Sequence, residues 1–191
     1  MFLTRRPTES EIKNFLDRSQ GLPLSYEPVG LARQQAKGFR LDVASCLLGQ
    51  GMGAFESARR ALTQWKQFEL GWVELFPCAA PTRPGTVVAV LIRHLGLWSL
   101  NACRIVYSLD AESPATEFGF AYGTLMNHAE MGEEIFVVSF DPVSENVTFT
   151  IRAASRPRAA LARLGYPYVR FCQSRFRRDS LAAMRHAVGS D

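Results

Sequence analysis

The chain has 191 residues, of which 47% are hydrophobic and 21% are charged, and its formal net charge is +4 at pH 7. This length and composition are typical of one globular domain with at most a short appendage, and they exclude a fibrous or wholly disordered protein. The longest apolar run extends only from Val87 to Ile92, whereas a membrane-spanning helix needs about 20 residues, so we expect no transmembrane segment.

The N-terminal part predicts two helices separated by one strand. A short amphipathic helix begins near Thr8 and belongs to an N-terminal helical extension, residues 1–24. Residues 39–48 alternate between apolar and polar side chains, as a strand does. The glycines in residues 49–53 indicate a strand-to-helix turn, because their spacing differs from that of a phosphate-binding loop. The next helix carries one apolar stripe, formed by Phe55, Ala58, Leu62 and Trp65.

Five strand-like segments then follow without a helix between them. They are residues 86–95, 99–109, 117–125, 134–140 and 146–153. The short breaks between them favour antiparallel neighbours.

The last part of the chain predicts helix. A short helix is expected to begin at Ser155-Arg156-Pro157 and to end at Gly165, and a long helix to begin near Pro167. The order of elements predicts an α+β domain of helix-grip type over residues 25–191. In this arrangement about six mainly antiparallel strands form a bent sheet, the long C-terminal helix covers its concave face, and the gap between them becomes a pocket.

The four cysteines, at positions 46, 78, 103 and 172, occur singly and form no CxxC pair. This usage argues against a disulfide framework and against a metal knuckle. We therefore expect four buried thiols in a reducing compartment and a cytoplasmic protein.

Positive charge is concentrated near the C-terminus. Residues 152–185 hold nine arginines against Asp179, a local charge of +8. The expected apolar stripe of the long helix leaves Arg170, Arg177 and Arg178 on other faces, which favours a solvated face. The helix lacks interleaved aromatic residues and any known reading motif, which argues against nucleic acid. An anionic surface, either lipid headgroups or RNA, remains an alternative partner.

Several strings in the chain resemble the signature of a bacterial and plant family catalogued as a domain of unknown function. The main string runs from Phe118 to Leu125 and is followed by His128 and by Gly132-Glu133-Glu134. Ser155-Arg156-Pro157 and Pro167-x-x-Arg170-x-x-Gln173 also match, and the resemblance covers roughly residues 25–188. The family has no assigned reaction, so the resemblance implies a fold similar to the START and Bet v 1-like superfamily and no particular chemistry.

His128, Glu133 and Glu134 form the one histidine–carboxylate cluster in the sequence. A histidine beside acids can act as a base near neutral pH or hold a metal. The spacing crosses an expected hairpin loop, unlike the HExxH arrangement on one helix, so we expect no metal ion. Three interpretations stay open: a glutamate paired with an arginine, a glutamate that caps the turn, and a polar ligand contact at the mouth of the pocket.

Other candidate residues have two interpretations each. Arg104 lies in an apolar strand, where it either faces solvent or points inward and needs Glu133, Glu134 or a ligand anion as its partner. Tyr122 lines a cavity or is plain core, and Arg156 caps a helix or reaches a ligand. Nucleophilic catalysis lacks support, because no GxSxG motif is present.

The sequence therefore favours a binding module for a small amphipathic or hydrophobic molecule, with neither a cofactor nor a metal. The alternatives are an enzyme in the same pocket with His128 as acid or base, and an interaction protein that uses its arginine-rich helix. We expect Tyr122, Glu133 or Glu134, Arg104 and one of Arg156 and Arg170 to form a single network. The predicted ligand-binding residues are Arg104, Tyr122, His128, Glu133, Glu134, Arg156 and Arg170.

Overall fold

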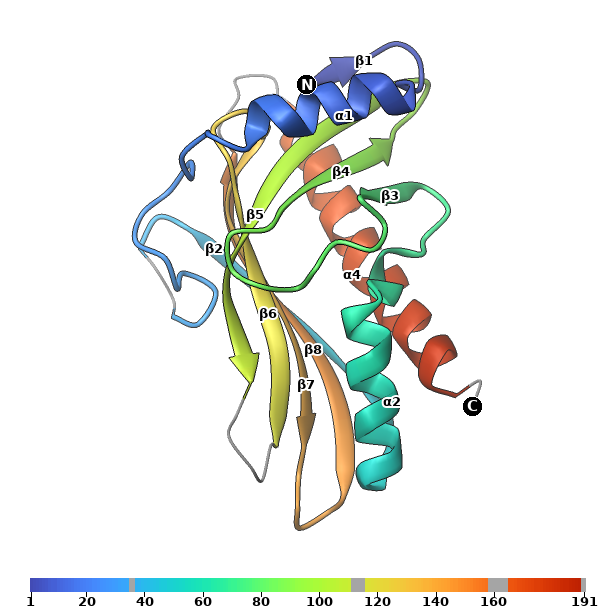
Figure 1. The fold of residues 1–191 in the computed structure, drawn as a ribbon. Helices are drawn as coiled ribbons and strands as arrows, with labels where there is room; N and C mark the ends of the chain where they lie inside the picture. Colours follow the sequence, from blue (N-terminus) through green and yellow to red (C-terminus); the bar gives the residue numbers. More distant parts are fainter. Residues whose placement is uncertain (35–36, 111–115, 158–164, 190–191) are drawn as a thin grey trace.

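The computed structural model describes residues 1–34, 37–110, 116–157 and 165–189 (Figure 1). The helix expected between residues 158 and 164 lies outside the described residues. In chain order the elements are β1 (Phe2–Leu3), α1 (Glu9–Ser19), β2 (Arg40–Gln50), α2 (Gly51–Thr63), the 3-10 turn η1 (Lys66–Phe68), β3 (Val73–Phe76), β4 (Val87–Arg93), β5 (Trp98–Asp110), β6 (Glu117–Thr124), β7 (Glu130–Phe140), β8 (Asn146–Pro157) and α4 (Tyr166–Val188).

One antiparallel sheet forms the body of the molecule. Its strand order is β2-β8-β7-β6-β5-β4-β3, and β1 pairs with β5 outside this path. The strands from β3 to β8 follow one another as a meander, and β2 closes the far edge beside β8. Figure 1 shows the sheet curling around α4, with α2 on the same side. The α+β helix-grip prediction is confirmed, although the sheet has eight strands and not about six, because the short β1 and β3 also pair.

The inner face of the sheet carries the main core. The predicted stripe of α2 is buried against it: Phe55 and Leu62 have exposed fractions of 0%. Trp65 follows α2, and its ring lies edge-on to the ring of Phe120, with 4.7 Å between the centroids. This packing holds α2 and η1 against β6 and β7, and α4 packs beside them on the same face.

The outer face of the sheet is covered at one end by α1. The helix begins with a capping box, in which Thr8 Oγ1 accepts from the amide of Glu11 and Glu11 Oε2 accepts from the amide of Thr8. Its buried Ile12 packs on Ala89 and Leu91 of β4. The strand is therefore covered on both faces, which explains the unbroken apolar run in this strand.

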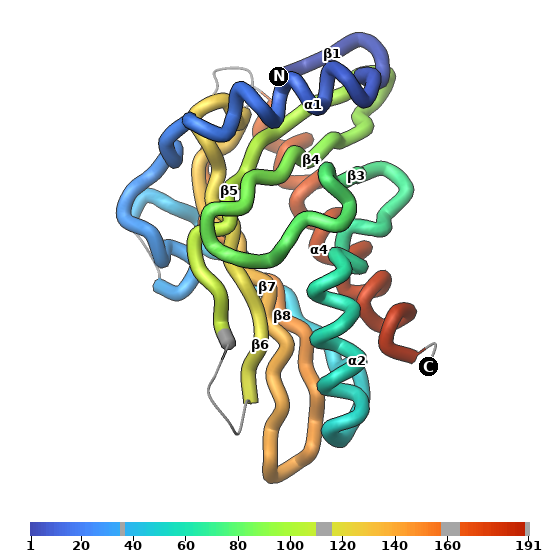
Figure 2. Tube along the Cα trace, in the orientation of Figure 1, coloured from blue at the N-terminus to red at the C-terminus, as the bar shows by residue number. Residues whose placement is uncertain are grey.

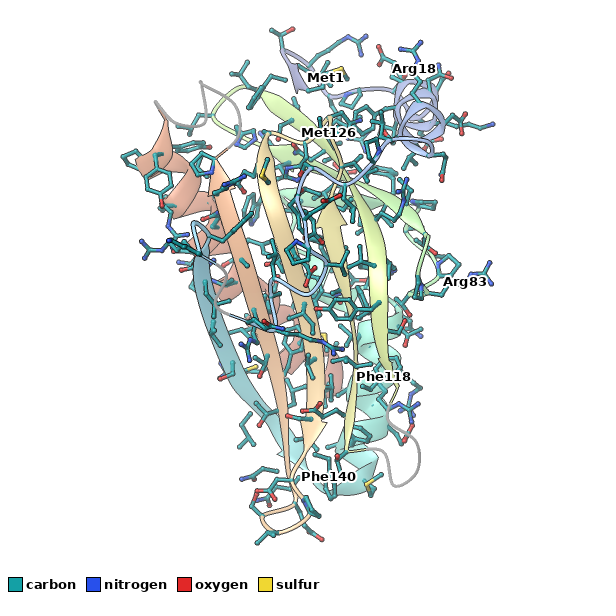
Figure 3. All side chains as sticks on the ribbon, turned by 90° about the vertical axis from the view of Figure 1, so that its left-hand side faces the viewer. Met1, Arg18, Arg83, Phe118, Met126 and Phe140 are labelled. Carbon is teal, nitrogen blue, oxygen red and sulfur yellow. The ribbon has the colours of Figure 1, made fainter. Side chains whose placement is uncertain are left out.

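The chain between α1 and β2 continues along the outer face. Figure 2 shows this segment descending on the side of the sheet away from α4. Tyr26, Leu31 and Ala32 are all buried there, and Figure 3 shows the same face with β2, β8, β7, β6 and β5 side by side. The N-terminal part of the chain is thus packed on the sheet over most of its described length.

The prediction that a helix begins at Ser155-Arg156-Pro157 is wrong, because these residues end β8. They pair with the start of β7, where Met131 lies opposite Arg156 and Glu130 opposite Pro157. A proline at the end of a strand is tolerated because the ladder needs no further donor there. β7 therefore begins earlier than the predicted strand 134–140, and both Glu133 and Glu134 lie within it.

The four cysteines are free thiols. Cys46 and Cys103 are buried and Cys172 is half-buried, but Cys78 is exposed, so the expectation of four buried thiols is wrong for Cys78. Among the helices of the described residues, none combines the length and the apolar composition needed to cross a bilayer.

Candidate functional site

A cavity of about 540 Å³ lies between the inner face of the sheet and α4. Its walls come from β4, β5, β6, β7, β8, η1 and α4, and most of them are apolar, as Val90, Ile92 and Phe176 illustrate. Polar side chains also border it, and they come from several strands and from α4. These lining side chains include Asn101, Tyr122, Thr124, His128, Glu130, Glu134, Gln173 and Arg177.

Tyr122 and Glu134 form the central polar pair of the cavity. They lie opposite each other on β6 and β7, and the Tyr122 hydroxyl donates to Glu134 Oε2 over 2.7 Å. Burial is the largest influence on Glu134 and raises the pKa of its carboxyl to about 7, although the hydrogen bond from Tyr122 acts in the opposite direction. Burial, together with the nearby carboxylate, also raises the pKa of Tyr122 well above its ordinary value. The pair therefore holds a carboxyl group that titrates near neutral pH.

Glu130 borders the cavity at the start of the same strand, β7. Its Oε1 accepts from Nε2 of Gln173 on α4 over 2.8 Å, and the same amide lies 3.2 Å from Ser155 Oγ. Burial raises the pKa of Glu130, against the effect of the Gln173 hydrogen bond. A neutral side chain of α4 thus faces a carboxyl of β7 that carries no cationic hydrogen-bond partner among the described residues.

Arg170 and Arg177 join α4 to β2 through Asp42. Arg170 donates to both carboxylate oxygens of Asp42, over 2.5 and 2.7 Å, and Arg177 Nη1 lies 3.7 Å from Oδ2. Burial acts to raise the pKa of Asp42, but the hydrogen bond from Arg170 and the charge of Arg177 outweigh it and leave this pKa below its ordinary value. The expectation that both arginines lie on a solvated face is wrong, because their side chains are only 18% and 10% exposed.

Two other arginines of α4 are also engaged within the chain. Arg175 stacks over the ring of Trp72 at 4.3 Å, and Arg178 binds Asp179 over 2.9 Å. Much of the local positive charge is therefore already matched by carboxylates and rings of the same molecule.

Glu133 points to the opposite face of the sheet, although it is adjacent to Glu134 in sequence. The residue is 3% exposed, and its carboxylate accepts from the hydroxyls of Tyr26 and Tyr107 over 2.8 and 2.7 Å. The amides of Gly30 and Ala32 donate to it as well, over 2.8 and 3.2 Å. Glu133 therefore fastens the segment after α1 to the outer face and takes no side-chain part in the cavity.

Arg104 and Arg156 also lie away from the Tyr122–Glu134 pair. Arg104 Nη2 donates to the carbonyls of Gln20 and Leu22, which follow α1 on the outer face. Arg156 stacks over the ring of Phe39 at 4.7 Å.

The expected single network is thus wrong in its membership. The structure brings Tyr122 and Glu134 together and places Arg170 nearby on α4, but Arg104, Glu133 and Arg156 serve other contacts. The reason is the alternation of strands, which sends neighbouring residues to opposite faces.

His128 lies in the turn before β7 and borders the cavity. Its Nδ1 accepts from the amide of Glu130 over 2.9 Å. Within the described ranges, no three histidine, cysteine, aspartate or glutamate side chains are grouped as a metal site.

Sequence reasoning missed Asp42, Glu130, Arg177 and Asn101 as parts of the site. Asp42 belongs to the more polar face of the strand at residues 39–48. In the structure this face points inward, because Asp42 lies opposite Ala153 of the cavity wall. A possible signal was the pairing of an acid in this strand with the basic helix.

Comparisons with known proteins identify the family. The family described as a domain of unknown function (DUF1990) matches residues 25–183. A UPF0548 protein of Dictyostelium discoideum is 33% identical over 210 residues, which covers 100% of this chain and 97% of that protein. A UPF0548 protein of Deinococcus radiodurans is 30% identical over 203 residues, which covers 99% of this chain and 100% of that protein.

Solved structures share the fold at low sequence identity. TTHA0849 from Thermus thermophilus is 11% identical with a TM-score of 0.53, over 80% of this chain and 100% of that one. The hypothetical protein jhp0584 from Helicobacter pylori is 9% identical with a TM-score of 0.54, over 84% of this chain and 94% of that one. Because the family description covers most of the chain and the homologues align over nearly all of it, the chain belongs to the DUF1990 family and is homologous to the UPF0548 proteins.

Proposed function

We propose that this protein binds a small amphipathic or hydrophobic molecule in the cavity between the sheet and α4. The observation that carries the proposal is the cavity itself, about 540 Å³ of space with mostly apolar walls and a few polar side chains among them. Ligand sites have this size and this mixture, because apolar walls supply affinity and a few polar groups fix orientation. The free thiols fit a cytoplasmic location, where cysteines stay reduced.

The test compares two substitutions to phenylalanine on β8. Ala153 borders the cavity, whereas Thr150 lies on the opposite face of the same strand. The neutral fluorescent probe N-phenyl-1-naphthylamine should bind the wild-type protein with one site per chain. Ala153→Phe fills the cavity and should weaken this binding at least tenfold, and Thr150→Phe should leave it unchanged. Equal binding by both variants and the wild type would place the probe elsewhere and overturn the proposal.

Native mass spectrometry supplies an independent readout. The protein purified under non-denaturing conditions should carry an additional mass that is lost after unfolding and refolding. Ala153→Phe should lack that mass.

A second candidate function is acid–base catalysis in the same cavity. The observation that favours it is the Tyr122–Glu134 pair, since a carboxyl with a pKa of about 7 is matched to proton transfer at neutral pH. His128 borders the cavity too and remains a candidate acid or base. Deuterium uptake by 2-decanone in D₂O, followed by NMR, should be faster with the wild type than with Glu134→Gln or His128→Gln. Equal rates in all three proteins would remove this candidate.

A further inference from the structure

Among the described residues, the arginines near the cavity gather on Asp42 and not on Glu130 or Glu134. In the described part of the chain, Asp42 has three guanidinium groups around it, those of Arg40, Arg170 and Arg177. Arg170 binds Asp42 with two hydrogen bonds, and Arg177 lies within ion-pair distance of the same carboxylate. None of the ion pairs formed by the described residues includes Glu130 or Glu134. In the part of the chain that the structure describes, the carboxyl groups of Glu130 and Glu134 therefore form no ion pair with an arginine.

The carboxyl groups of Glu130 and Glu134 each accept a hydrogen bond from a neutral donor. In the described part of the chain, Glu134 accepts from the Tyr122 hydroxyl and Glu130 from the Gln173 amide. A buried carboxylate that lacks a cation is costly, so a positive charge brought by a ligand would be favoured here.

Aromatic rings border the cavity beside Glu134. Tyr122, which binds Glu134, lies 6.3 Å from Phe68 between ring centroids, and Phe68 lies 5.2 Å from Phe176. All three rings line the cavity. Ring faces attract ammonium groups through their quadrupole, and such cages recognise organic cations.

The wall of the cavity also holds a buried hydrogen-bond acceptor that lacks a partner among the described residues. Asn101 of β5 is 3% exposed and lines the cavity, and its Oδ1 has no hydrogen-bond partner among the described residues. Buried polar atoms are normally paired, so an N–H donor from a ligand would satisfy this group. Asn101 therefore favours a ligand that also carries a hydrogen-bond donor.

We propose that the ligand is an apolar amine, whose protonated nitrogen lies beside Glu134 among the rings of Tyr122, Phe68 and Phe176 while its hydrocarbon part fills the apolar walls. This inference rests on the proposed function and adds the chemical class of the headgroup. Ammonium binding supplies the missing positive charge and lowers the pKa of Glu134. The titratable and charged groups that face Glu134 from the neighbouring elements are Asp42 on β2, Cys103 on β5, Tyr122 on β6, Glu130 on β7 and Arg177 on α4.

The experiment uses three probes with one hydrocarbon chain and different headgroups: decylamine, decanol and decanoic acid. Isothermal titration calorimetry at pH 8 should give a Kd for decylamine at least tenfold below those of the other two. Glu134→Gln keeps the shape of the side chain and should remove this advantage, with the Kd of decanol changed less than twofold. Glu9→Gln removes an exposed carboxylate of α1 and should leave all three values unchanged.

A second measurement uses the wild-type protein alone and so does not depend on the folding of a variant. Lowering the pH from 8 to 5 protonates Glu134. The Kd of decylamine should then rise at least tenfold, while the Kd of decanol stays constant. If decanol or decanoic acid binds as tightly as decylamine, the amine inference is overturned but the binding function stands. If decanoic acid binds best, Arg177 receives the headgroup and the inference is also wrong. If none of the three probes binds, the proposed function fails together with the inference.

Discussion

The phenol of Tyr26 occupies the space that a side chain at Gly123 would fill. A Cβ atom built at Gly123 would overlap the Tyr26 hydroxyl oxygen and lie 2.7 Å from the ring. Gly123 is the cross-strand neighbour of Glu133, to which that hydroxyl donates. The absence of a side chain on β6 thus allows the segment after α1 to reach the buried carboxylate on the outer face.

Gly123→Ala should therefore lower the free energy of unfolding by about 1–3 kcal/mol, the usual effect of overpacking a buried site. Urea denaturation followed by circular dichroism measures the change. Gly53→Ala is the matched control, because a Cβ there meets nothing within 4 Å and the residue lies inside α2. The control should be neutral or stabilising by about 0.5–1 kcal/mol, because alanine favours a helix. An unchanged stability of Gly123→Ala would contradict the described contact.

The tyrosine hydroxyls on Glu133 should each contribute measurably to stability. Tyr26→Phe and Tyr107→Phe remove one donor each from a buried carboxylate and should lower the free energy of unfolding by about 1–3 kcal/mol apiece. The double variant should differ from the sum of the single ones, since both donors share one acceptor group. Amide hydrogen exchange of residues 26–32 should also accelerate in both variants. If all three variants unfold with nearly the wild-type free energy, Glu133 does not hold residues 26–32 on the sheet.

Stability should fall as the pH rises through the range in which Glu134 ionises. The pKa of Glu134 is raised from 4.5 to about 7 in the folded protein, so the folded state binds more protons than the unfolded state between these values. The resulting stability is fully present below pH 4.5 and is lost by about pH 7, with a change of about 1–3 kcal/mol.

Urea denaturation at several pH values should show this loss in the wild type and a flatter profile in Glu134→Gln. Glu130 has a raised pKa as well and should leave a residual slope in the variant. Identical profiles for wild type and variant would mean that Glu134 titrates normally.

The Arg170–Asp42 ion pair should contribute far more to the free energy of unfolding than an exposed ion pair does. Arg170→Met removes both short hydrogen bonds from a mostly buried carboxylate, leaves it with the longer contacts to Arg40 and Arg177, and should cost about 2–4 kcal/mol. Lys66→Met breaks an exposed pair with Glu69 and should change stability by less than about 1 kcal/mol. Thermal unfolding of both variants tests the contrast, and an equally small effect of Arg170→Met would argue that this pair does not anchor α4.

Local periodicity was sufficient to predict most elements of this protein. The three- and four-residue spacing of Phe55, Ala58 and Leu62 predicted the buried face of α2, and all three are fully buried. The run of strand-like segments with short breaks predicted the antiparallel meander, because each short link leaves its strands as neighbours. The helix-grip fold followed from that order of elements.

The faces and partners of the charged residues were decided by tertiary structure. Glu133 and Glu134 are adjacent in sequence, but the register of β7 sends one to the outer face and the other into the cavity. Arg170 faces inward because Asp42, 128 positions away in the chain, offers it a carboxylate. The sequence by itself determined the pattern of apolar side chains, since burial of that pattern drives each element to pack. Only the tertiary structure decided which polar groups meet, because a buried charge is tolerated only where the fold brings a distant partner within hydrogen-bond reach.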